Sequence, residues 1–264
     1  MQTSRTTAPV SQMSQAYPDR VEVRGRDLAG DLMGRLSFTE YFHLLLTGRE
    51  PSEDQRFFLD VLLVAIAEHG MMPTNVAARM TLAADPGSLQ GAVAAGILGC
   101  GPVLLGTAEP CARLLTQAQE RVAAGAKPEE VALDLAREIR AAGGRAPGFG
   151  HPVHRPVDPR AERILELTDA RGVGGPHVLL ARRFREAVPE VWGRPLPMNV
   201  SMPIAAVMLD LGFPPGAVKA IPLLARTAGL LAHLAEEQRR PIGFLMAGRA
   251  EEAVTYDPGA EDGA

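Results

Sequence analysis

The 264-residue chain has few cysteines, a small net charge and no uninterrupted apolar run long enough for a membrane span. Its two cysteines, Cys100 and Cys111, lie in apolar or small-residue helical sequence, so we expect buried free thiols and a reducing cytoplasm rather than a disulfide. The formal net charge is only -4 and the isoelectric point is near 5.9, which argues against nucleic acid or an anionic membrane as the main partner. The longest apolar run, residues 91–106, is shorter than the roughly 20 residues of a membrane span and contains Pro102. We expect it to form a buried helix.

Repeats and strand patterns are also absent. No period of about 20 to 50 residues recurs, which argues against a solenoid, and no alternating strand pattern is flanked by hairpin turns. Helical signals are present instead: Ser52 and Gln55 form a capping-box pattern, and Pro128 opens a helix that Gly143 closes. Further helices are expected near residues 159–170, 177–188, 199–211 and 216–237. The sequence therefore predicts an all-α fold.

Composition also indicates where order should begin and end. The Ser-, Thr- and Gln-rich start predicts a disordered lead-in over residues 1–22, and residues 251–264 predict a flexible tail. The Gly- and Pro-rich stretches 143–159 and 189–197 are the best candidate joints.

The stretch with the most chemistry is residues 148–160, GFGHPVHRPVDPR, which places two histidines and two arginines beside a glycine turn. The glycines allow His151 to be presented from a tight turn. Asp158 is predicted to be a helix N-cap, with Pro159 at the first helical position. Arg160 then lies in a first helical turn, where a bare cation opposes the helix dipole, so a bound carboxylate explains it better than helix stability does.

The other histidines have simpler interpretations. His151 and His154 are spaced as a metal pair, but no cysteine is near and Asp158 is better used as the cap, so no metal site is predicted. His43, His177 and His233 lie in amphipathic sequence, and we interpret them as ordinary surface or core residues.

The pattern G-F-G-H-x-V-x-R-x-x-D-P-R resembles the catalytic loop of the citrate synthase family, which includes citryl-CoA lyases and the C-terminal part of ATP-citrate lyase. The resemblance runs from Val23 to Pro241 and is similar to the short form of the family. Other stretches agree with the family in order: VRGRDL, FTEYFHLLLTGREP, AEHGMMPTNVAAR, GPVLLGTAE, MNVSMPIAAVMLDLGF, LARTAGLLAHL and RRP.

The resemblance implies an architecture. It implies a large helical domain made of residues 23–109 and 195–250, and a small domain of residues 110–194. It also implies a homodimer or homotetramer whose helices pack through small residues, with Arg240 entering the partner's site.

The resemblance also implies which residues hold the substrate. His69, Arg160, Arg226 and Arg240 would anchor the carboxylates of citrate or oxaloacetate, which arginine binds in a planar, bidentate way. By residue type alone, other roles are open for three of them. His69 could stabilise a helix end, Arg226 could form a structural salt bridge, and Arg240 could be a basic residue that ends a helix.

A CoA thioester would be the second substrate, and no permanently bound cofactor is expected. His151 would hydrogen-bond the oxygen that is a carbonyl in oxaloacetate and an alkoxide in the intermediate, acting as acid or base. Arg155 would contact CoA phosphate. The loop expected to meet the adenine through backbone groups consists of Ala146, Pro147, Gly148, Phe149 and Gly150.

Two positions depart from the family pattern. Leu104 stands where citrate synthases have the histidine that polarises the thioester carbonyl, and Ser201 stands where they have the aspartate that takes the acetyl proton. Losing a positioned base commonly costs about 10² to 10⁴ in rate. Glu109, His154 or Asp210 could replace it, with Asp210 the weakest candidate.

Three functions therefore stay open. The first is a citryl-CoA lyase-like enzyme, run in either direction. The second is a citrate or methylcitrate synthase with a relocated base. The third is a non-catalytic paralogue that binds CoA or a dicarboxylate.

Overall fold

The computed structural model describes residues 10–101 and 103–257. The chain divides into two compact units, one ending at Val61 and the other beginning at Leu62. Helix α2 (Glu53–Ala67) runs across this boundary and begins with the predicted capping box, in which Ser52 Oγ accepts from the Gln55 N–H at 3.2 Å. The division into a large and a small domain, with the boundaries given above, stays a prediction.

The first unit contains a small sheet that the sequence analysis does not predict. Strands β1 (Ser14–Ala16), β2 (Val21–Val23) and β3 (Arg26–Asp27) pair antiparallel in that order. A short π-helix, η1 (Leu28–Leu32), and α1 (Phe38–Thr47) follow. The predicted disorder of residues 1–22 is therefore wrong for β1 and β2, because their backbone groups pair with each other although β1 is exposed.

The second unit is built of helices, so the all-α fold class is confirmed. After the end of α2 it contains α3 (Pro73–Ala84), α4 (Leu89–Leu98), α5 (Ala108–Ala123), α6 (Pro128–Ala141), α7 (Pro159–Arg171), α8 (Pro176–Trp192), α9 (Ser201–Asp210), a 3-10 turn η2 (Pro215–Ala217), α10 (Ala220–Arg239) and α11 (Gly243–Ala253).

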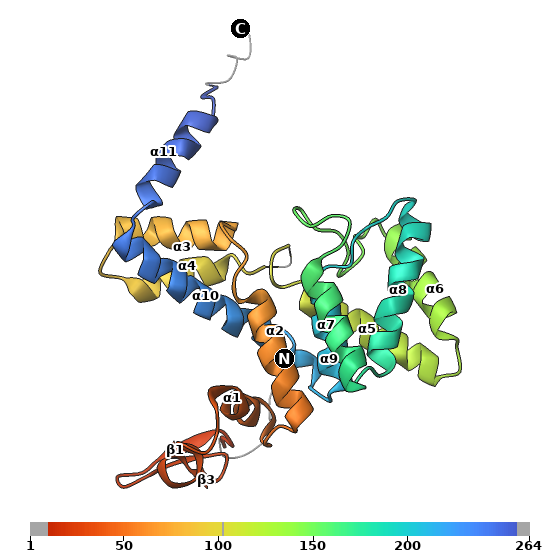
Figure 1. Cartoon of the computed structure of the whole chain (residues 1–264), viewed down its shortest axis with the longest axis horizontal. Helices are drawn as coiled ribbons and strands as arrows, with labels where there is room; N and C mark the ends of the chain where they lie inside the picture. The colour runs from red at the N-terminus through yellow and green to blue at the C-terminus, as the bar shows by residue number, and fades with distance from the viewer. Residues whose placement is uncertain (1–9, 102, 258–264) are drawn as a thin grey trace. The chain divides into compact units, whose positions relative to one another are not determined.

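Helices α3, α4 and α10 pack together, with α11 against α3 (Figure 1). Their shared core consists of Ala78, Leu82, Ala92, Leu230 and Leu234. Glycine also makes the close approach of α10 to the end of α2 possible. A Cβ on Gly229 of α10 would lie 2.0 Å from the carbonyl oxygen of Ala67 at the end of α2, well inside van der Waals contact.

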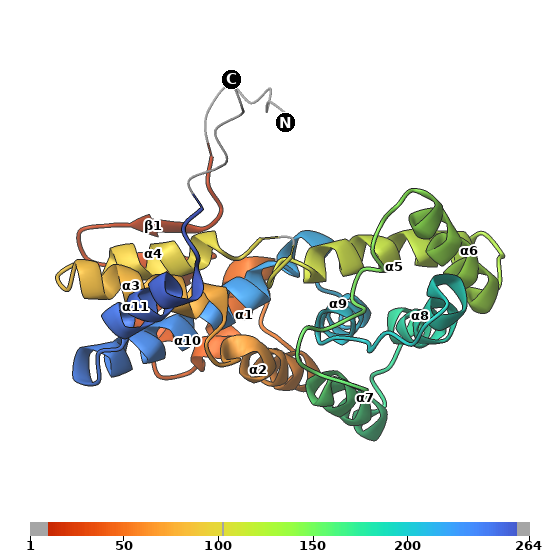
Figure 2. The same ribbon diagram turned by 90° about the horizontal axis from the view of Figure 1, so that it is seen from above.

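Helices α5, α6, α8 and α9 form a second packed group within the same unit, and α7 packs on α9 (Figure 2). Cys111 in α5 is buried and Cys100, after α4, is half-buried; both are free thiols, as expected. The N-terminus of α9 and the loop before α7 meet in the candidate site described below.

Two apolar stretches differ from their sequence interpretation. The expected buried helix over residues 91–106 ends at Leu98, and the chain then turns, leaving Leu98 85% and Val103 82% exposed; Pro102 lies outside the described residues. Residues 215–239, which include α10, are long and apolar enough to cross a membrane by composition. Half of that stretch is buried inside the protein, and α10 buries Arg226 and Glu237, as a core helix does.

Candidate active site

The loop before α7 forms the tight turn that its glycines predict. Gly148 has φ +76, and a Cβ there would lie 2.8 Å from Met202 Cβ and 2.9 Å from Cys111 Sγ, so only glycine fits. The loop is held by the segment leading into α9. The Gly150 N–H donates to the Pro197 carbonyl at 2.7 Å, and the Asn199 amide donates to the Gly150 carbonyl at 3.0 Å.

This turn fixes the protonation of His151. Its Nδ1 accepts hydrogen bonds from the backbone N–H groups of Val153, at 3.0 Å, and His154, at 2.9 Å. The proton of the neutral ring therefore resides on Nε2. Partial burial, together with the neighbouring charge of His154, lowers the pKa of His151 from 6.5 to about 4. His151 is thus a neutral hydrogen-bond donor at pH 7.

Three imidazoles converge at this point. The ring of His154 stacks on that of His151 with centroids 4.4 Å apart, and the ring of His69, which follows α2, lies 5.2 Å from His151. The Nε2 atoms of His69 and His154 are 3.0 Å apart, so one donates to the other. Partial burial, followed by the charge of Arg160, lowers the pKa of His69.

The three histidines offer ligand atoms within 4.8 Å of one another, as a metal site would. The donor set does not suit a cation, however. The lone pair of His151 faces its own backbone, its Nε2 carries a proton, and the Nη2 of Arg160 lies 3.4 Å from that Nε2. Metal ligation needs a deprotonated nitrogen, and a nearby guanidinium repels a dication. The cluster suits an anion better.

Asp158 is the N-cap that the sequence predicts, but Arg160 is not a bare cation, because it pairs with the Asp158 carboxylate. Asp158 caps α7 by accepting from the Arg160 N–H at 3.1 Å, and it is buried. Its carboxylate also pairs with the Arg160 guanidinium at 2.8 Å and accepts from the Val200 N–H at 3.2 Å. Burial alone would raise the pKa of Asp158, but these Arg160 contacts lower it overall. Asp158 thus holds Arg160 beside His151.

Arg226 is the most informative side chain of the site. It is only 2% exposed, and its Nη atoms donate to Asn75 Oδ1 at 3.2 Å and to the Ile66 carbonyl at 3.4 Å. Its Nε has no hydrogen-bond partner, and no carboxylate pairs with it within the described residues. Burial lowers its pKa, and its charge in turn acts on His69. Arg226 thus forms no structural salt bridge among the described residues, although the charge of Glu68 acts to raise its pKa, and an anionic ligand would supply the missing pair.

A neighbouring network supports this side of the site, and sequence reasoning missed it. Arg79 of α3 is fully buried and pairs with Glu237 at 2.9 Å and with Glu236. Its Nε also donates to Nδ1 of His233 at 2.9 Å, and His233 reaches Glu68 at 2.8 Å. The signal available in the sequence was Arg79 itself, a charged residue among the apolar residues of 76–84.

The remaining predicted site residues lie in varied surroundings. Ser201 is 5% exposed at the start of α9, and its hydroxyl lies 2.5 Å from the Thr107 hydroxyl. Leu104 is half-buried in the turns before α5. Arg155 is exposed on the loop, and Arg240 is exposed at the end of α10. Within residues 10–101 and 103–257 no hydrogen bond or ion pair joins either guanidinium to the histidine cluster.

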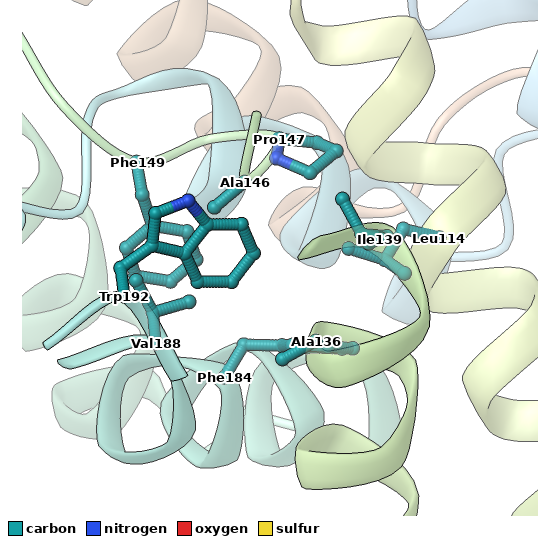
Figure 3. A pocket seen from close by; sticks show the side chains of 9 residues that line it. All are labelled: Leu114, Ala136, Ile139, Ala146, Pro147, Phe149, Phe184, Val188 and Trp192. Carbon is teal, nitrogen blue, oxygen red and sulfur yellow. The ribbon is translucent and has the colours of Figure 1, made fainter. Parts of the chain in front are cut away.

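The loop predicted to meet adenine borders an apolar pocket. The pocket is too narrow to hold a water molecule, and it is lined by Leu114, Ala136, Ile139, Ala146, Pro147, Phe149, Phe184, Val188 and Trp192. Figure 3 shows the Trp192 indole on one side and Leu114 and Ile139 on the other. Several backbone groups of the loop are already used, since the Phe149 N–H donates to Ala146 and the Gly148 carbonyl accepts from Asn199.

Two of the candidate bases, Asp210 and Glu109, are engaged in hydrogen bonds and ion pairs with other residues. Asp210 is buried and accepts from the backbone N–H groups of Gly175, His177 and Val178 at 2.9 to 3.0 Å, and from His177 Nδ1 at 2.7 Å. It caps α8. Glu109 pairs with Arg113 at 2.5 Å and with Lys219 at 3.7 Å.

The imidazoles and the Arg160 guanidinium that meet beside one glycine loop offer hydrogen-bond donors to an anionic ligand. Residues 6–243 match the family model of the citrate synthase C-terminal domain, and the chain belongs to the citrate synthase family.

Individual relatives agree. The chain is 32% identical over 201 residues to putative citrate synthase 2 of Mycobacterium tuberculosis, covering 72% of this chain and 50% of that protein. The chain thus spans about half the length of the curated relatives it matches first. The structure of citryl-CoA lyase from Hydrogenobacter thermophilus superposes with a TM-score of 0.83 at 28% identity, covering 97% of this chain and 96% of that one. ATP citrate lyase from Methanothrix soehngenii, in complex with citrate and coenzyme A, has a TM-score of 0.76 at 20% identity, with coverages of 98% and 43%.

Proposed function

We propose that this protein is a citryl-CoA lyase-type enzyme, which splits citryl-CoA or a close 3-hydroxyacyl-CoA into acetyl-CoA and an oxo acid, or runs the reverse condensation. The observation that carries the proposal is Arg226, a buried guanidinium without a carboxylate partner among the described residues, whose charge reaches the histidine cluster. A carboxylate of the substrate would supply the missing anion, and arginine binds carboxylates in a bidentate way.

His69, Arg160 and Arg226 would together hold the oxo acid. The neutral Nε2–H of His151 would donate to the oxygen that is hydroxyl in citryl-CoA and carbonyl in the oxo acid. Such a donor stabilises the alkoxide that develops during C–C cleavage and need not change its own protonation state. A low pKa is an advantage in this role, because the ring stays neutral at pH 7.

The CoA part of the substrate would lie along the loop Ala146–Gly150, with Arg155 near a phosphate. The apolar and aromatic side chains beside this loop, Phe149 and Trp192 among them, are of the kind that an adenine ring packs against, although the pocket that they line would have to widen to admit the ring. The assembly would be a homodimer or homotetramer in the cytoplasm, in which Arg240 enters the partner's site.

Cleavage rather than synthesis is supported by a comparison that covers nearly the whole of both chains and is with a citryl-CoA lyase. The lyase and the synthase alternative both need a group that gives or takes the acetyl proton, and the Ser201 hydroxyl, shared with Thr107, cannot serve as that base near pH 7. That same feature favours the second candidate, a paralogue that binds its ligands without turnover.

The test uses purified full-length protein. Citryl-CoA is supplied and oxaloacetate is followed through malate dehydrogenase and NADH; separately, acetyl-CoA and oxaloacetate are supplied and free thiol is followed. Cleavage supports the lyase, and thiol release without cleavage supports the synthase. Silence in both assays, with oxaloacetate or CoA binding by calorimetry, supports the binding protein. Turnover that survives His151→Ala would remove the proposed mechanism.

A further inference from the structure

The proposed reaction moves a proton to or from carbon, and the described carboxylates around the site are engaged elsewhere. Asp210 caps α8, and Asp158 is buried against Arg160 and the Val200 N–H. Glu68 accepts from the backbone N–H groups of His69, at 2.8 Å, and Gly70, at 2.5 Å, and from His233. Burial would raise the pKa of Glu68, but these hydrogen bonds lower it overall. A carboxylate that is so strongly hydrogen-bonded is a poor proton acceptor.

Within the described residues, His154 is the basic group of the cluster that stays available. Its ring is half-buried and stacks on His151, so both imidazoles face the same region. Its Nε2 is 3.0 Å from the Nε2 of His69, and when His154 donates in this contact the lone pair of its neutral ring is on Nδ1, which has no hydrogen-bond partner among the described residues. His151, in contrast, has its lone pair tied to the loop backbone and can only donate.

We infer that His154 is the catalytic residue that carries the proton between the acetyl carbon and the substrate hydroxyl, taking over the role for which Ser201 is unsuited. The inference rests on the proposed function, because it assigns a step in that reaction.

The step balances with one imidazole. In cleavage, neutral His154 takes the proton of the tertiary hydroxyl on Nδ1, because its Nε2 is engaged with His69; the C–C bond breaks, and its electron pair becomes the thioester enolate while the alkoxide becomes a carbonyl. The enolate carbon then takes the proton back from His154, which gives acetyl-CoA and returns the ring to its neutral form. Condensation is the same sequence reversed. His69 would steady the protonated ring through the Nε2 contact, and His151 would stabilise the alkoxide.

Variants of His154 separate the role of its side chain from the role of its backbone in holding the loop. His154→Gln and His154→Ala leave intact the backbone N–H that donates to His151 Nδ1. Val153→Ala is the matched control, since Val153 supplies the other backbone donor to His151 and its side chain is 65% exposed. For each protein we would measure citryl-CoA cleavage, oxaloacetate binding by calorimetry, and exchange of the acetyl-CoA methyl hydrogens in D₂O with malate in place of the oxo acid.

Both His154 variants should lose about 10² to 10⁴ in cleavage rate and lose methyl exchange, while they keep the oxaloacetate affinity; Val153→Ala should keep all three. Methyl exchange at the wild-type rate in His154→Gln would overturn the inference and leave the lyase proposal standing. If the wild type exchanges but does not cleave, and His154→Gln stops the exchange, the lyase proposal fails and His154 stands. A wild type that does neither overturns both.

Discussion

Two arginines in this helical unit are buried to nearly the same degree and differ in their partners. Arg79 is surrounded by Glu236, Glu237 and His233, whereas Arg226 has only neutral acceptors and an unpartnered Nε within the described residues. Removing one member of a buried ion pair strands the other, but removing a buried charge that has no pair relieves a desolvation cost. The partners of the two side chains therefore distinguish Arg79, a structural arginine, from Arg226, which we propose binds a ligand.

We expect Arg226→Met to raise the free energy of unfolding of the ligand-free protein by about 1–3 kcal/mol and to abolish oxaloacetate binding. The matched variant Arg79→Met should lower it by about 3–5 kcal/mol, because Glu237 is left buried and unpaired. Chemical denaturation and calorimetry measure the two effects. Equal destabilisation by both variants would contradict a ligand role for Arg226.

His151 should also affect stability as a function of pH. The pKa of His151 is about 4 in the folded protein and near 6.5 in the unfolded chain. Between pH 4 and pH 6.5 the unfolded chain therefore binds a proton at His151 that the folded protein does not bind. The contribution of His151 to stability is therefore fully present above pH 6.5 and declines as the pH falls toward 4. His151→Gln should flatten the fall of the melting temperature between pH 7 and 5. Identical slopes for wild type and variant would show that the pKa of His151 is not depressed.

At the scale of secondary-structure elements, helix ends are joined by side chains from elsewhere in the chain. Asp210, the last residue of α9, accepts from backbone donors at the start of α8, including the N–H groups of Gly175 and Val178. Burial would raise the pKa of Asp210, but the hydrogen bonds from His177 and the backbone lower it overall. Asp210 is thus a structural cap, which excludes it as the base considered from the sequence.

Asp210→Asn should lower the free energy of unfolding by about 1–3 kcal/mol, because the amide places a donor against backbone donors. The folded variant should turn over substrate at the wild-type rate. Thermal unfolding together with the coupled cleavage assay tests both statements. A stable variant that had lost activity would return Asp210 to the list of bases.

Glycine sets the contact between α2 and α10. Gly229→Ala would place a Cβ 2.0 Å from the Ala67 carbonyl oxygen, and overpacking of this kind costs about 1–3 kcal/mol. Gly248 of α11 is the control, since an added Cβ there meets nothing within 4 Å. Gly248→Ala should stabilise the protein by about 0.5–1 kcal/mol through helix propensity. Equal shifts of the denaturation midpoint in Gly229→Ala and Gly248→Ala would show that the contact between α2 and α10 adjusts to the added Cβ.

At the scale of the whole molecule, one chain does not bring every predicted anchor together. His69 and Arg160 lie beside His151 of the loop, and the charge of Arg226 acts on His69, but Arg240 is exposed at the end of α10. The proposed dimer would complete the site, because a two-fold interface can lend each subunit a residue of the other.

Mixing two inactive variants tests that arrangement. Arg240→Ala and His151→Ala should each be inactive as pure dimers. In a randomly reassociated mixture half of the dimers are mixed, and each carries one intact site, so activity should return to about a quarter of the wild-type value. Size-exclusion chromatography of the mixture confirms reassociation. Reassociated dimers without activity would show that Arg240 acts within its own chain or not at all.

The sequence by itself determined the helical fold class, the capping of α2 by Ser52 and of α7 by Asp158, and the glycine turn that presents His151. These features depend on neighbouring residues, because periodicity, caps and backbone freedom act over a few positions. The sequence did not predict the β1–β2 pairing, because short exposed strands carry no alternating pattern. It also did not predict the exposed turns after Leu98, because apolar composition does not determine burial.

Only the tertiary structure decided which charges are paired. Arg79 and Arg226 look alike in the sequence, and their difference arises from Glu236 and Glu237, about 160 residues beyond Arg79 and brought to it by the packing of α3 on α10. The approach of His69 to His154, 85 positions apart, is equally invisible along the chain. Long-range packing determines burial and partners, and burial and partners determine whether a charged or titratable side chain stabilises the fold or is left for a ligand.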